Sequence, residues 1–123
     1  MIDTSEMNKM EQPYAKVTLE DIERIVKRDY PYADSVKIFE ILNKYTIGEK
    51  YRVWAAALKL SDKDITKLEE HIKIAIHDYR DVIAYAEYPE YSRKVGFNSD
   101  KITKEEIAEI YNRDWTQYKK WLQ

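Results

Sequence analysis

YRVWAAALKLSDKDITKLEEHIKIAIHDYRDVIAYAEYPEY, residues 51–91, decides the fold of this chain. Its first ten residues carry only two charges, Arg52 and Lys59, and both lie on one side of a helical wheel. A helix that is apolar nearly all round is normally enclosed by other helices. It is too short to cross a bilayer, which takes about 20 apolar residues. We therefore predict a core helix over residues 50–60.

A second, longer helix is predicted over residues 62–88. Ser61 and Asp64 are placed as N-cap and third residue, the spacing of a capping box. Pro89 prevents the helix from continuing. Apolar residues recur every three or four positions along this segment, which predicts that one face of the helix points inward. Its members are Ile65, Leu68, Ile72, Ala75, Ile76, Tyr79, Val82, Ile83 and Ala86.

Three shorter amphipathic helices are expected around this pair. They span residues 18–30, 33–45 and 103–122, and the inward face of the second includes Val36. Thr18 with Asp21, and Thr103 with Glu106, have the spacing of capping boxes at the starts of the first and third helices. Residues 92–101 are predicted to form a loop, because Gly96 and Asn98 interrupt any helical period. Residues 1–17 form a flexible or loosely docked arm, with Met7 and Met10 as possible anchors, and residues 18–123 form one domain. The fold class is all-α, a single-domain helical bundle of about five helices.

Composition restricts the function. The 123 residues include 21 Lys and Arg against 23 Asp and Glu, and no cysteine. A balanced, slightly acidic chain lacks the basic surface that nucleic-acid binding needs. Without cysteine there are no disulfides or thiolate metal ligands. With neither a signal peptide nor a transmembrane segment, we expect a cytoplasmic protein with no membrane or nucleic-acid partner, no cofactor and no metal.

A candidate protein-binding surface lies opposite the inward face of residues 62–88. Tyrosine combines a large contact area with a polar tip and is enriched at interface hot spots. The alternative is that another helix, or the segment 92–101, covers this end of the helix. The predicted binding residues are Ile74, Asp78, Asp81, Tyr85, Tyr88 and Tyr91.

A second hypothesis uses the acidic residues of the same region for catalysis. His77, Asp78, Asp81 and Glu87 could form a small metal-dependent or carboxylate-based hydrolase site, since carboxylates do acid–base work when their surroundings separate their pKa values. His71 and His77 do not share a helical face, unlike the histidine pairs of helical zinc sites. The competing interpretation is a network of salt bridges and hydrogen bonds between helices around the helix end.

The run from Arg52 to Tyr91 also resembles a family of short bacterial helical proteins. The resemblance rests on an Arg-Val start at Arg52, a Leu-Lys-Leu turn at 58–60, and the segments DYRDV and AEYP. It implies only a bacterial, cytoplasmic, helical protein and brings no activity with it.

The first functional hypothesis is a non-enzymatic protein-interaction module. Its partner would be a second copy of the chain, as in a homodimer, or another protein, as in an immunity or antitoxin-like inhibitor. Both forms fit a small, helical, acidic-leaning chain that has no catalytic motif.

Overall fold

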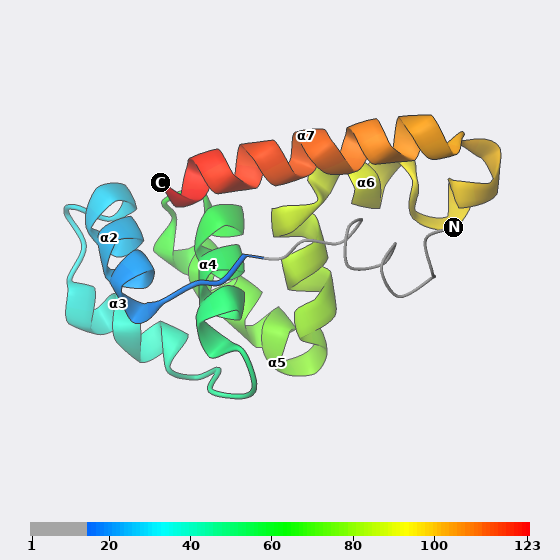
Figure 1. Ribbon diagram of the computed structural model, residues 1–123. Coiled ribbons are helices and arrows are strands. Elements are labelled where there is room, and N and C mark those ends of the chain that lie inside the picture. The colour runs from blue at the N-terminus through cyan, green and yellow to red at the C-terminus, as the bar shows by residue number, and fades with distance from the viewer. Residues whose placement is uncertain (1–14) are drawn as a thin grey trace.

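The computed structural model describes residues 15–123, without the side chains of Phe97 and Ser99. Within these residues the protein has α-helices and one 3-10 helix but no strand, which confirms the all-α prediction (Figure 1). The elements are α2 (Leu19–Asp29), α3 (Ser35–Leu42), α4 (Lys50–Ser61), α5 (Ile65–Glu87), α6 (Pro89–Lys94), η1 (Gly96–Lys101) and α7 (Lys104–Leu122).

Helix α4 lies at the centre of the molecule, as its apolar sequence predicts. The segment from Val53 to Leu58 is buried throughout, and residues of α2, α3, α5 and α7 join it in the core. The indole of Trp54 meets the rings of Phe39 and Tyr51 edge to face, and its Nε1 donates to the carbonyl oxygen of Tyr45 at 2.8 Å. The polar atom of this large core side chain is therefore satisfied.

The turn between α4 and α5 differs from the predicted capping box. Ser61 is the last residue of α4, and its buried hydroxyl donates to the carbonyl oxygen of Ala57. Asp62 and Lys63 have positive φ angles of 48° and 69°, which end α4. Asp64 is the N-cap of α5, and its carboxylate accepts from the backbone N–H of Thr66 and Lys67. Aspartate is as good an N-cap as serine, so α5 begins at Ile65.

Helix α5 is kinked, although the sequence predicts one continuous helix. Asp78 has non-helical angles (φ −151°, ψ 89°), and its carboxylate accepts from the backbone N–H of Arg80, as an N-cap side chain does. The kink breaks the predicted inward face. Leu68, Ile72, Ala75, Val82 and Ala86 are buried as expected, but Ile76 and Tyr79 are 50% and 44% exposed.

The segment after Pro89 is helical, and the predicted loop over residues 92–101 is wrong. Helix α5 ends at Glu87 and α6 begins at Pro89. Proline favours the first turn of a helix, where its missing N–H has no intrahelical acceptor. η1 follows, and Val95 between the two short helices is fully buried.

Helix α7 runs along one side of the molecule and reaches α2 at its C-terminal end (Figure 1). There Arg24 and Arg28 of α2 donate to the carbonyl oxygens of Leu122 and Trp121. These carbonyls have no intrahelical partner, so α2 completes the end of α7. Thr103 caps the other end by accepting from the backbone N–H of Glu106, which is one of the two hydrogen bonds of the predicted capping box.

The outer helices confirm most of the remaining sequence assignments. α2 begins with the predicted capping box of Thr18 and Asp21 and ends before Pro31. α3 is shorter than predicted at both ends, since Asp34 is its N-cap and the helix ends at Leu42, and Val36 is 63% exposed instead of inward. Ala15 is buried and Val17 packs against the core, whereas residues 1–14 of the predicted arm, including Met7 and Met10, lie outside the described residues. No helix in the described part of the chain is long and apolar enough to cross a membrane.

Candidate protein-binding site

A groove of about 550 Å³ opens beside the C-terminal end of α5, and we call it the tyrosine groove. Its walls come from α4, α5, α6, η1 and α7, so it joins parts of the chain that are far apart in sequence. It is lined by Arg52, Tyr79, Arg80, Asp81, Ile83, Ala84, Tyr85, Glu87, Tyr88, Tyr91, Ser92, Gly96 and Tyr111.

An ion pair between α4 and α5 contributes to the lining. Arg52 Nε and Nη2 donate to the two carboxylate oxygens of Glu87 at 2.8 and 2.9 Å. The side chain of Glu87 is fully buried and that of Arg52 is 21% exposed. Hydrogen bonding to Glu87 raises the pKa of Arg52. The bidentate geometry fixes the two helices relative to each other, and the charges of the two residues cancel.

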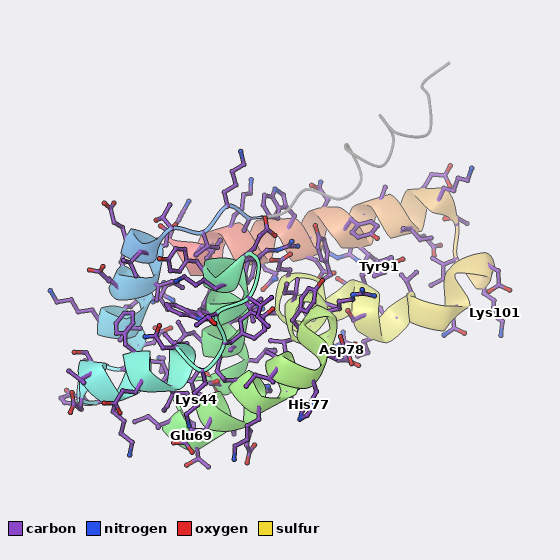
Figure 2. The ribbon with its side chains drawn as sticks, turned by 90° about the horizontal axis from the view of Figure 1, so that it is seen from below. Lys44, Glu69, His77, Asp78, Tyr91 and Lys101 are labelled. Carbon is purple, nitrogen blue, oxygen red and sulfur yellow. The ribbon has the colours of Figure 1, made fainter. Side chains whose placement is uncertain are left out.

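Three tyrosines form a packed cluster on one wall. Tyr111 of α7 stacks on Tyr91 with ring centroids 4.4 Å apart, and it meets the ring of Tyr88 edge to face at 5.2 Å. Figure 2 shows Tyr91 at the place where α6 and α7 lie together. Burial raises the pKa of Tyr88 to about 12, so its hydroxyl is protonated at neutral pH. The cluster offers a surface of packed aromatic rings.

Side chains of other helices stabilise the α5–α6 junction, which carries Tyr88 and Tyr91. Asp114 of α7 is 2% exposed, and its carboxylate oxygens accept from the backbone N–H of Glu90 and Tyr91 at 3.1 and 2.9 Å. Burial raises the pKa of Asp114, and these two N–H groups oppose that rise. Lys59 of α4 donates to the carbonyl oxygen of Ala86 at 2.8 Å. The C-terminal end of α5 and the N-terminal end of α6 are thus both capped by side chains distant in sequence.

The rim of the groove is exposed. Tyr79 and Tyr85 are 44% and 55% exposed, although both are large aromatic side chains. Arg80 lies over the ring of Tyr79, with its guanidinium carbon 5.9 Å from the centroid. Asp81 is exposed beside it. Among the described residues, none forms an ion pair with Arg80 or Asp81.

Four of the six predicted binding residues line the groove: Asp81, Tyr85, Tyr88 and Tyr91. Ile74 and Asp78 do not line it. Ile74 is exposed on the part of α5 before the kink, and Asp78 forms the kink itself. The alternative prediction, that another helix covers this end of α5, holds in part. α7 packs on Tyr88 and Tyr91, while Tyr85 stays exposed.

The residues of the hydrolase hypothesis are divided by the fold. Only Asp81 and Glu87 line the groove, and the carboxylate of Glu87 is bound by Arg52. His77 and Asp78 are exposed at the kink of α5 (Figure 2). Residues 15–123 contain no group of three His, Asp or Glu side chains placed to hold a metal ion. The predicted network between helices is present, with Arg52–Glu87 and the hydrogen bonds of Asp114 as its main members.

Several groove residues were not among the predicted site residues, and they include Arg52, Tyr79, Arg80 and Tyr111. Arg52 carried a signal, since a lone arginine on an otherwise apolar helix needs a buried partner. Tyr79 and Tyr111 carried none, because their spacing assigns both to inward faces. The kink turns Tyr79 outward, and α7 brings Tyr111 to α6.

No family model, curated protein or solved structure matches this chain. Function is therefore inferred from the contacts of the protein itself.

Proposed function

We propose that the protein is a non-enzymatic protein-interaction module and that the tyrosine groove is its binding surface. The observation that carries the proposal is the pair of exposed tyrosines, Tyr79 and Tyr85, in a groove that is also lined by a packed tyrosine cluster. Aromatic anchors of this kind dominate binding energy at protein interfaces.

The construction of the groove supports the proposal. Ring contacts with Tyr111 hold Tyr88 and Tyr91 in place before any partner arrives, and the backbone N–H of Tyr91 also donates to Asp114. A preformed surface loses less conformational entropy on binding than a mobile one. The Arg52–Glu87 pair adds no net charge, so a partner can cover it without leaving an isolated charge buried.

The test is site-specific photocrosslinking in the cells that naturally make the protein. A photoreactive phenylalanine analogue replaces Tyr85 in one variant and Tyr32 in a control variant. Tyr32 is 99% exposed and does not line the groove, so it samples chance encounters. We expect a discrete protein adduct from position 85 and none from position 32.

Two results would overturn the proposal: no adduct from position 85, or equal adducts from both positions. The mass of the adduct also identifies the partner. A toxin in the adduct would make the protein an immunity or antitoxin-like inhibitor, and an adduct of twice the chain mass would indicate a second copy.

A further inference from the structure

The exposed part of α5 carries an unusual share of the apolar surface of the protein. Eight large hydrophobic side chains are exposed in the described residues, and four of them lie on α5: Ile74, Ile76, Tyr79 and Tyr85. They flank the kink at Asp78 and continue to the groove rim. Large apolar side chains exposed on one helix, two of them at the groove, favour an interaction site there.

The charges on this surface decide which partner fits it. Groove-lining residues of both signs are present in equal number, Arg52 and Arg80 against Asp81 and Glu87. Arg52 and Glu87 neutralise each other, which leaves Arg80 and Asp81 adjacent and without ion-pair partners in residues 15–123. A partner surface whose charges are all of one sign gains no net electrostatic attraction from such a face. A surface with neighbouring charges of both signs is complementary to itself.

Self-complementarity is the requirement of a two-fold dimer. In an isologous interface, if residue i contacts residue j of the partner, then j contacts i of the partner as well. If a two-fold axis passes between Arg80 and Asp81, Arg80 of each copy pairs with Asp81 of the other, which gives two ion pairs. The rim tyrosines of the two copies then face each other. A stable interface takes about 800 Å² from each partner, roughly a tenth of the 8463 Å² surface of this chain.

We propose that the tyrosine groove and the exposed face of α5 form a homodimer interface in which Arg80 of each copy pairs with Asp81 of the other. This inference rests on the proposed function and names the partner as a second copy of the chain.

Charge exchange tests the pairing. Sedimentation equilibrium on the purified full chain should show a dimer. Arg80→Asp alone and Asp81→Arg alone each place like charges together twice, and we expect each to raise the dimer dissociation constant at least about tenfold. The double variant Arg80→Asp/Asp81→Arg restores opposite charges and should return the dissociation constant close to that of the wild type. Both positions are exposed, so folding should be unaffected, which circular dichroism can verify.

Matched controls change charge by the same amount away from the interface. Lys44→Asp and Glu40→Arg alter exposed residues outside the groove and should leave the dimer intact. A wild-type monomer, or a double variant that stays as weak as the single ones, would overturn the inference. The proposed function fails separately: a monomer that still crosslinks to a different protein through position 85 removes the dimer and keeps the interaction module.

Discussion

At the scale of single residues, the Arg52–Glu87 pair explains how charged side chains can stand between two core helices. Each partner would be costly to bury alone, and the bidentate contact offsets that cost. The pair also sets the register of α4 against α5, because the two hydrogen bonds form in only one arrangement of the helices. The position of Tyr88, the neighbour of Glu87, depends on that register.

Removing one partner of this pair should therefore destabilise the protein strongly. We expect Glu87→Ala to lower the free energy of unfolding by about 3 kcal/mol, near the lower end for buried pairs, because water reaches part of Arg52. The double variant Arg52→Met/Glu87→Met should lose less, since no isolated charge remains. Glu49→Ala is the control: it removes the exposed partner of the same arginine and should cost less than about 1 kcal/mol. Urea unfolding measures all three, and equal losses for Glu49→Ala and Glu87→Ala would contradict this account.

At the scale of helices, the junction between α5 and α6 is stabilised by residues that belong to neither helix. Lys59 binds the last turn of α5 and Asp114 binds the first N–H groups of α6. Helix ends are normally capped by adjacent residues, and here Pro89 and its neighbours supply no side-chain cap. The α6 segment is consequently ordered by α7.

Asp114→Ala should loosen α6 specifically. We expect the free energy of unfolding to fall by about 1 to 2 kcal/mol, the usual effect of losing an N-cap. The amide hydrogens of Glu90 and Tyr91 should exchange faster with solvent, as hydrogen–deuterium exchange followed by NMR would show. Asp34→Ala, which removes the cap of α3, should also destabilise the protein while leaving the relative protection of Glu90 and Tyr91 unchanged. Unchanged exchange at these two amides in Asp114→Ala would refute the capping role.

The sequence predicted helices where the signals are local, and it missed the features that depend on distant contacts. The apolar run in α4, the capping box at Thr18 and the cap at Thr103 are all read from neighbouring residues, and all are confirmed. The α6 helix was missed because its cap, Asp114, lies 24 residues from Glu90. The kink was missed because Asp78 fits a charged outer face in a straight helix equally well, and only its non-helical angles show that it acts as a cap.

At the scale of the whole molecule, the candidate site is assembled from segments that the sequence keeps apart. Four of the groove residues were predicted from the outer side of the helix expected over residues 62–88 and the segment after it, whereas Arg52 and Tyr111 reach the groove only through the packing of α4 and α7. Such packing brings together residues with no periodic relation, so no local pattern reveals it. The same packing leaves Tyr79 and Tyr85 exposed, and those two side chains are what a partner would cover.

If a second copy covers them, folding and dimerisation are linked by mass action, and stability depends on protein concentration. For a chain of this size, raising the concentration from about 1 to about 100 μM should increase the melting temperature of the wild type by roughly 5 °C. Arg80→Asp, which places like charges across the interface and weakens the dimer, should show a smaller rise in melting temperature over that range. Lys44→Asp, with the same change in charge outside the groove, should follow the wild type. Thermal unfolding followed by circular dichroism at several concentrations makes the comparison. A wild-type melting temperature that does not change with concentration would mean that the tyrosine groove of the native protein is not covered by a second copy.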